Sequence, residues 1–278
     1  MKNVQQESSV AIIGCGWLGL ALAKALIADN IEVLATTTDE KKLPLLAKQN
    51  IAAEVLSLPQ NNIEILAEQK VFSQSHLIIC IPPKLKQGLS NYPEKISQIV
   101  SAAEIGSVKH IILISTTAVY GGLEGSVDEA SSLDVTINKV KVLTEAEQAV
   151  LAFTGKANVL RLAGLVGPER HPGRFFKGNR KLASPNISVN LIHQQDAVGL
   201  IRALLLPSSP YGIFNGVSNT HDSKKEFYQA AASVFNSPLP LIGDSNNQAI
   251  DKQVKGEKAK KQLHYQFVYD DLLTWLKQ

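Results

Sequence analysis

The fold is decided by one stretch near the start of the chain, Val10-Ala-Ile-Ile-Gly-Cys-Gly-Trp-Leu-Gly19. Its apolar beginning, Val10–Ile13, is typical of a buried strand, and leucines at helical spacing follow it. Between strand and helix, Gly14 permits a tight turn, Gly16 lets the backbone approach a pyrophosphate, and Gly19 permits close helix–strand packing. The N–H groups and the dipole at the helix start favour an anion. A tight turn that binds nothing is the alternative, and the flanking strand and helix favour a dinucleotide.

Short apolar runs alternate with helical patterns along the chain, and this alternation predicts the fold class. Near-continuous apolar strands separated by helices are typical of a parallel sheet covered on both faces, so we expect an α/β fold with a Rossmann-type, doubly wound sheet. The expected strands are Val10–Ile13, Ile31–Ala35, Ala53–Leu56, His76–Ile81, His110–Ser115, Asn158–Leu162 and Gly212–Gly216. The expected helices include Asp39–Gln49, Pro93–Glu104, Lys139–Phe153, Asp196–Leu206 and one that begins with the capping box Ser223-Lys-Lys-Glu226.

The texture of the sequence changes after about residue 165, where Gly, Pro and basic residues cluster in Gly167-Pro-Glu-Arg-His-Pro-Gly-Arg174. We therefore expect a dinucleotide-binding domain over residues 1–165, to which residues 188–216 return. A smaller, discontinuous lobe that binds the substrate is expected from residues 166–187 and 217–278.

Composition narrows the class of protein. The chain has 278 residues, 45% of them apolar, and 28 Lys and Arg against 25 Asp and Glu leave a net charge of +3, too slight to predict nucleic-acid binding. Cys15 and Cys80 are too few for a disulfide framework, and no stretch approaches about 18 uninterrupted apolar residues. No basic segment leads into an apolar one at the N-terminus, so we expect a cytoplasmic protein without a membrane segment.

The choice between NAD and NADP depends on the end of the second strand. An Asp or Glu there would bind the free ribose 2′-OH of NAD, yet strand register puts Thr37 at that position. Hydroxyls followed by Lys41 and Lys42 suit a 2′-phosphate, which gives a slight preference for NADP. Asp39 is also at a permissible spacing, and the lysines fit a solvated helix face equally well. The candidate cofactor contacts are Gly14, Gly16, Trp17, Leu18, Gly19, Thr37, Thr38, Ile81 and Pro82.

Several further segments carry a recognisable pattern. They are Ile114-Ser-Thr-Thr-Ala-Val-Tyr-Gly121, Asp128-Glu129, Leu160-Arg-Leu-Ala-Gly-Leu-Val-Gly-Pro168, Asn190-Leu-Ile-His-Gln-Gln-Asp196, Phe214-Asn215-Gly216 and Lys258-Ala-Lys-Lys-Gln-Leu-His-Tyr265. Together they resemble the extended short-chain dehydrogenase/reductase family, of the NAD-dependent epimerase/dehydratase type, over nearly the whole chain. The stretch from Arg161 to Phe176 is most similar to a bacterial branch of that family, the YeeZ-like proteins.

The resemblance implies a catalytic hydroxyl at Thr116 but not the family's usual proton-transfer pair. That pair is a Tyr followed four residues later by a Lys, whose ammonium lowers the pKa of the Tyr. If Lys141 matches the family lysine, Ile137 stands where the tyrosine should be. If the register is shifted two residues later, Lys139 stands at the tyrosine position and Leu143 replaces the lysine. Neither register restores the pair.

Two residues are candidates to replace the missing Tyr and Lys of the proton-transfer pair. Tyr120 lies just beyond the strand that carries Thr116, although a packing role in an ordinary turn is the favoured alternative. Lys141 is the candidate lysine, although a solvated helix lysine is the commoner case.

The loop that follows Arg161 carries a basic trio, Arg170, His171 and Arg174. The resemblance places this loop at the substrate cleft, which implies an anionic substrate such as a phosphate or carboxylate. A basic surface loop is the alternative. Arg161 itself lies in an apolar strand, so we expect its charge to be paired with a carboxylate or a ligand.

Two functions follow as hypotheses. The first is an NAD(P)-dependent oxidoreductase or epimerase/dehydratase that acts on a small anionic or nucleotide-sugar-like molecule without the usual pair, its proton coming from Tyr120, water or the substrate. The second is a non-catalytic protein that senses NAD(P) and reports to a partner. A nucleic-acid-associated regulator is weaker. No histidine spacing favours a metal, and both a monomer and a homodimer fit the pattern.

Overall fold

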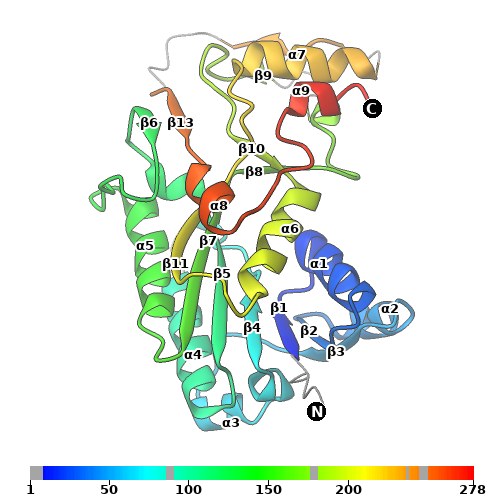
Figure 1. The fold of residues 1–278 in the computed structure, drawn as a ribbon, viewed down its shortest axis with the longest axis vertical. Coiled ribbons are helices and arrows are strands. Elements are labelled where there is room, and N and C mark those ends of the chain that lie inside the picture. The colour runs from blue at the N-terminus through cyan, green and yellow to red at the C-terminus, as the bar shows by residue number, and fades with distance from the viewer. Residues whose placement is uncertain (1–8, 86–90, 176–180, 236–237, 244–249) are drawn as a thin grey trace. The chain divides into compact units, whose positions relative to one another are not determined.

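The computed structural model describes residues 9–85, 91–175, 181–235, 238–243 and 250–278. Its central feature is a seven-stranded sheet in the order β11-β7-β5-β4-β1-β2-β3 (Figure 1). The strands are β1 (Val10–Ile13), β2 (Val33–Thr37), β3 (Ala52–Val55), β4 (His76–Ile79), β5 (His110–Thr116), β7 (Lys156–Leu162) and β11 (Gly212–Gly216). The pairs β1–β2, β2–β3, β1–β4 and β4–β5 are parallel. The predicted doubly wound Rossmann-type sheet is confirmed.

The sequence explains why β1 lies in the interior of this sheet, between β4 and β2. All four residues of Val10–Ile13 are buried, as expected for a strand covered on both faces. Helix α1 (Trp17–Ala28) follows and buries a stripe that includes Leu18, Leu22 and Leu26. A Cβ on Gly19 would collide with the carbonyl oxygen of Gly14, so only glycine permits this close approach of helix and loop.

The first compact unit of the chain comprises Met1–Ser115, Lys141–Leu160 and Leu204–Ile213. Its helices are α1, η1 (Glu40–Lys42), α2 (Leu43–Ala47), α3 (Ile63–Ala67), η2 (Lys70–Ser73), α4 (Tyr92–Ile105) and most of α5 (Asn138–Leu151). The segment predicted as one helix, Asp39–Gln49, is helical from Glu40 to Ala47 but in two short pieces, because Asp39 caps a 3₁₀ turn before α2 begins. The second strand begins at Val33 rather than Ile31.

The second compact unit comprises Thr116–Val140, Arg161–Ala203 and Phe214–Gln278. Its elements are η4 (Thr117–Tyr120), β6 (Gly125–Val127), β8 (Gly164–Val166), η5 (Pro172–Arg174), β9 (Lys181–Leu182), β10 (Leu191–His193), most of α6 (Gln194–Leu205), α7 (Lys224–Val234), β12 (Leu241–Ile242), β13 (Lys252–Val254), α8 (Glu257–Gln262) and α9 (Leu272–Trp275). Its core joins Phe227 and Ala231 of α7 to Leu272 and Leu276 at the end of the chain. The predicted capping box at Ser223 and Glu226 is confirmed. The boundaries expected from the sequence, which divide the chain near residue 165, stay a prediction.

Within the described ranges, none of the helices is both long and apolar enough to cross a membrane. The same ranges hold no group of three or more His, Cys, Asp or Glu side chains arranged to hold a metal ion.

Candidate functional site

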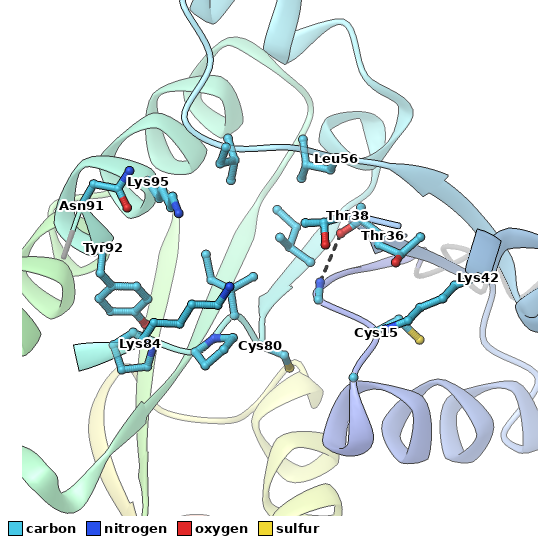
Figure 2. Close-up of a pocket in the computed structure, with 18 residues that line it drawn as sticks. Cys15, Thr36, Thr38, Lys42, Leu56, Cys80, Lys84, Asn91, Tyr92 and Lys95 are labelled. Carbon is cyan, nitrogen blue, oxygen red and sulfur yellow. Dashed lines mark hydrogen bonds between the residues drawn. The ribbon is translucent and has the colours of Figure 1, made fainter. Parts of the chain in front are cut away.

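A cavity of about 550 Å³ lies in the first unit at the carboxyl ends of four neighbouring strands (Figure 2). The order of strands reverses between β1 and β4, and ligands of open α/β sheets bind in the crevice at such a point. Residues that follow β1, β2, β3 and β4, together with the start of α4, form its walls. They are Ile13, Gly14, Cys15, Gly16, Thr36, Thr37, Thr38, Lys42, Leu56, Leu58, Cys80, Ile81, Pro82, Pro83, Lys84, Asn91, Tyr92 and Lys95.

The glycine loop is tied to the end of β2. The N–H of Gly14 donates to Thr36 Oγ1 at 3.1 Å, and the N–H of Cys15 donates to the Thr36 carbonyl at 2.9 Å. Gly14 has φ +100°, and a Cβ there would lie 3.1 Å from the carbonyl carbon of Cys80. A Cβ on Gly16 would meet nothing within 4 Å, so the backbone there opens onto free space. This is the geometry that a bound diphosphate requires.

The end of β2 offers the cavity an ammonium and no carboxylate. Asp39 uses its carboxylate to accept the N–H of Lys41 at 3.0 Å and caps η1, and it does not line the cavity. Lys42 does line it, whereas Lys41 does not. Thr37 Oγ1 accepts the N–H of Asp39 at 3.1 Å, which holds this loop in place. At this strand end the cavity therefore receives the Lys42 side chain, while the carboxylate of Asp39 serves the cap of η1.

The walls that follow β3 and β4 combine apolar side chains with basic ones. Leu56 and Leu58 follow β3, and Ile81 and Pro82 follow β4. Lysines at positions 84 and 95 complete the wall, and among the residues that the structure describes no acidic side chain lines the cavity.

Neither thiol at the site is ionised at neutral pH. Burial raises the pKa of Cys80 to about 12. Burial also raises the pKa of Cys15, against the opposing charge of Lys42. Cys15 therefore serves as a small packing residue rather than as a reactive thiol.

Six of the predicted cofactor contacts line the cavity: Gly14, Gly16, Thr37, Thr38, Ile81 and Pro82. Trp17, Leu18 and Gly19 do not line it; the last two are buried in the packing of α1. Sequence reasoning missed Thr36, Leu58, Lys84, Asn91, Tyr92 and Lys95. For Thr36, Leu58 and Lys84 the signal was positional, because they lie at or after the carboxyl end of a strand, where ligands of such sheets bind. Asn91, Tyr92 and Lys95 lie at the start of α4 and carried no such signal.

The predicted catalytic residues Thr116 and Tyr120 belong to the second unit. Thr116 Oγ1 accepts the N–H of Ala118 at 3.2 Å and caps the 3₁₀ turn η4. Tyr120 is fully buried at 0% exposure, where its hydroxyl donates to Asn215 Oδ1 at 2.8 Å and accepts from Arg161 Nη1 at 3.0 Å. Burial raises the pKa of Tyr120, and the nearby guanidinium opposes that rise. The packing alternative for Tyr120 is favoured.

The buried guanidinium of Arg161 is paired with the side chain of Tyr120. Its guanidinium lies 5.2 Å from the centroid of the Tyr120 ring as well as donating to the phenol oxygen. The same network extends through Asn215, whose N–H donates to Glu129 Oε1 at 2.6 Å and whose Nδ2 donates to the Lys255 carbonyl at 2.9 Å. The partners expected for Arg161 were a carboxylate or a ligand, and the structure adds a phenol.

Lys141, the third predicted catalytic residue, is on the surface of α5. Its side chain is 61% exposed and lies 4.0 Å from Glu145, one helical turn on. This favours the alternative of a solvated helix lysine.

The basic trio of the loop divides into two kinds of residue. Arg170 and Arg174 are exposed. His171 uses Nδ1 to accept the N–H of Gly173 at 3.1 Å, and its ring packs 5.2 Å from that of Trp275. Burial lowers the pKa of His171, and the charge of Arg174 lowers it further. The arginines therefore supply the positive charge of this loop, while His171 shapes it.

His193 and Asp196 have structural roles. The Asp196 carboxylate accepts from the Tyr265 hydroxyl at 3.0 Å and from the N–H groups of Val268 and Tyr269 at 2.7 and 2.9 Å. The His193 ring lies 4.0 Å from that of Tyr269, and burial lowers its pKa to about 4, so it is neutral at physiological pH.

The sequence and the structure were compared with those of known proteins. No family model matches the chain. The chain is 30% identical to protein YeeZ of Escherichia coli strain K12 over 268 residues. The aligned region covers 95% of this chain and 97% of YeeZ. A protein of Methylobacillus flagellatus, named provisionally as an NAD-dependent epimerase/dehydratase, has a similar fold, with a TM-score of 0.79 at 23% identity over 96% of both chains. The Bordetella bronchiseptica enzyme WbmG, solved in complex with NAD and UDP, gives a TM-score of 0.75 at 18% identity over 95% of this chain and 92% of that one.

Proposed function

The chain belongs to the same family as Escherichia coli YeeZ, and from that premise we propose that it binds a nicotinamide dinucleotide in the cavity of the first unit and acts as an oxidoreductase or epimerase/dehydratase. One observation carries the proposal: Gly16 opens onto free space at the N-terminus of α1, with the loop around it fixed by Thr36. The fold shared with WbmG, whose structure contains NAD, supports the choice of ligand.

We propose NADP as the preferred dinucleotide. The diphosphate would lie against the amides of Gly14–Gly16, and the ribose beside Thr37 and Thr38. Lys42 would then neutralise the 2′-phosphate, since Asp39 is turned to its capping role.

The substrate we propose is a small anion or a nucleotide sugar. Arg170 and Arg174 would bind its charged group, because exposed guanidinium groups suit phosphate and carboxylate. The UDP in the WbmG structure is a ligand of this chemistry.

The nicotinamide would supply or accept a hydride, and the chain would position the substrate and exclude competing reactions. Thr116 is the catalytic residue that we retain. Its oxygen accepts from the N–H of Ala118, and within the described residues its hydroxyl proton has no acceptor, so it would be able to donate to a substrate oxygen. Tyr120 and Lys141 would act only after leaving their present surroundings, so we propose water or a substrate hydroxyl as the source of the proton.

A non-catalytic NAD(P) sensor is the second candidate. It is favoured by the burial of Tyr120 and the exposure of Lys141, which leave the family's proton-transfer pair without an evident replacement. The sensor would bind the dinucleotide through the same cavity.

Titration with NADPH and NADH, followed by nicotinamide fluorescence, tests the shared premise. We expect NADPH to bind about tenfold more tightly, which corresponds to about 1.4 kcal/mol, and Lys42→Met to remove that difference. Lys41→Met is the matched control, because Lys41 has the same charge at the neighbouring position and does not line the cavity. No binding of either dinucleotide would refute the proposal, and binding without turnover on carbonyl or nucleotide-sugar substrates would favour the sensor.

A further inference from the structure

A tight turn follows η4 in the second unit and packs against the start of α5. A Cβ on Gly121 would lie 3.2 Å from Val140 Cγ2. A Cβ on Gly122 would lie 2.7 Å from Ile137 Cδ1, and Gly122 has φ +84°, a conformation that favours glycine. The two glycines therefore bring η4, which Thr116 caps, next to the first turn of α5.

Two lysine side chains meet at this turn. Lys252 of β13 donates a hydrogen bond from Nζ to the carbonyl oxygen of Tyr120 at 2.8 Å. Strand β13 pairs with β6, and Figure 1 shows the two strands side by side. Lys139 is exposed in the first turn of α5. Burial lowers the pKa of Lys252 and the positive charge of Lys139 lowers it further, so the two ammonium groups lie within electrostatic reach of each other.

The described part of the chain supplies no carboxylate that pairs with either ammonium. The carboxylates nearest in sequence are used elsewhere. Asp134 accepts from the N–H of Thr136 at 3.1 Å, and Asp251 accepts from the N–H of Ser188 at 2.8 Å. The first turn of α5 has no acidic residue, and a cation is unfavourable there because the helix dipole leaves partial positive charge at that end. Within these residues, an excess of positive charge stays unneutralised at the turn.

We propose that Lys139 and Lys252 form a binding site for an oxyanion, a carboxylate or phosphate group of a small molecule. The bond to the Tyr120 carbonyl anchors Lys252 and uses one of its three N–H groups, so two remain for a ligand. Among the described residues Lys139 has no hydrogen-bond partner, so all three of its N–H groups are available. A bound oxyanion would satisfy these donors and remove the repulsion between the two charges.

The site would hold the charged group of a substrate at the turn that begins after Thr116, the hydroxyl that we retain as catalytic. The inference rests on the proposed function for this role of the ligand as a substrate. The binding of an oxyanion does not depend on a dinucleotide in the first unit, so the two can fail separately.

The test asks whether inorganic phosphate stabilises the full chain through these lysines. Thermal unfolding would be followed in phosphate and in chloride at equal ionic strength, for the native protein, Lys139→Met and Lys141→Met. Lys141→Met is the matched control, because it removes the same charge from an exposed position two residues further along α5. We expect phosphate to raise the Tm of the native protein and of the control alike. Lys139→Met should weaken the apparent Kd for phosphate at least about tenfold, and Lys139→Arg should restore it.

In chloride, Lys139→Met should unfold at a higher temperature than the native protein, because it removes a charge that repels Lys252 and the start of the helix. A lower Tm of this variant in chloride would contradict the excess of charge and overturn the proposal. Phosphate bound only at the glycine loop would stabilise Lys139→Met as much as the native protein, and that result would overturn it too, as would the lack of any phosphate effect.

NADPH titration of the same proteins separates this proposal from the proposed function. If the phosphate result overturns the site while NADPH still binds, the proposed function stands. If phosphate binds through Lys139 while the native protein binds no dinucleotide, the oxyanion site stands and the proposed function is refuted.

Discussion

The N–H of Gly14 and the hydroxyl oxygen of Thr36, 22 residues apart in sequence, lie 3.1 Å apart and form a hydrogen bond. Thr36 is 2% exposed, so this bond lies in the interior. It joins the turn after β1 to the end of β2, the two places at which a dinucleotide would be gripped.

Thr36→Val should therefore lower both stability and affinity. Valine keeps the shape and removes the acceptor, which leaves the Gly14 N–H unsatisfied at a cost of about 1–3 kcal/mol. Urea denaturation would measure the loss, and NADPH titration the weaker binding. Thr38→Val, at an exposed position of the same strand end, is the control and should keep native stability.

Two glycine substitutions should separate folding from binding. Gly16→Ala should fold with native stability, since a Cβ there meets nothing within 4 Å, yet bind NADPH at least about tenfold more weakly because the methyl group would occupy the diphosphate space. Gly19→Ala should instead destabilise the fold, because its Cβ would collide with the Gly14 carbonyl oxygen. Thermal denaturation and calorimetry on both variants would decide. Native NADPH affinity in Gly16→Ala would contradict the proposed position of the diphosphate.

Tyr120→Phe should act on stability more than on chemistry. The substitution removes a hydroxyl that serves Asn215 and Arg161 together, and leaving a buried charged donor short of an acceptor costs about 1–3 kcal/mol. Denaturant unfolding measures this loss. If instead turnover fell more than a hundredfold while stability stayed native, Tyr120 would be the proton donor after all.

Lys141→Met should change almost nothing. An exposed ion pair of this kind contributes about 0–1 kcal/mol, and the side chain is 61% exposed. Unfolding and NADPH binding should both stay native. A large loss of turnover with unchanged binding would assign Lys141 to the proton-transfer machinery.

The free energy of unfolding should fall in mild acid because of His110 on β5. In the first unit this side chain faces two others, His76 on the neighbouring strand β4 and Asn158 on the neighbouring strand β7. Its Nε2 lies 2.8 Å from Asn158 Oδ1, and its Nδ1 lies 3.3 Å from His76 Nδ1. Burial lowers its pKa to about 4, with a hydrogen bond to Asn158 opposing and the charges of Lys156 and His76 assisting. A histidine whose pKa is lower in the folded state gives full stability above about pH 6.5, and that stability is lost as the pH falls toward 4.

The measurement is the free energy of unfolding between pH 7 and pH 4, for the native protein and for His110→Gln, which cannot titrate. We expect the variant to lose less stability over this range, by about 1–3 kcal/mol. His264→Asn is the control, since His264 is exposed and asparagine tolerates its φ of +48°. Parallel curves for native and His110→Gln protein would contradict the assignment.

Sequence patterns predicted the structural features that depend on residues close together in the chain. The strand Val10–Ile13, the turn at Gly14 and the helix that follows are local features, and each was predicted with its physical reason. The wall that Lys95 adds to the cavity was not predicted, because it is set by how α4 packs against Gln60. A packing role for Tyr120 was the favoured alternative, but its partners lie 41 and 95 positions further on in the chain, so no local pattern identifies them.

The carboxylate of Asp196 finds its three hydrogen-bond donors 69 to 73 residues later in the chain. Because a ribosome delivers the chain from its N-terminus, that carboxylate emerges long before its partners exist. The second unit would thus wait, incompletely folded, until synthesis has passed Tyr269. A chaperone that binds the incompletely folded chain during this time would cover more unpaired polar and apolar groups here than in a protein whose contacts form between residues close together in sequence.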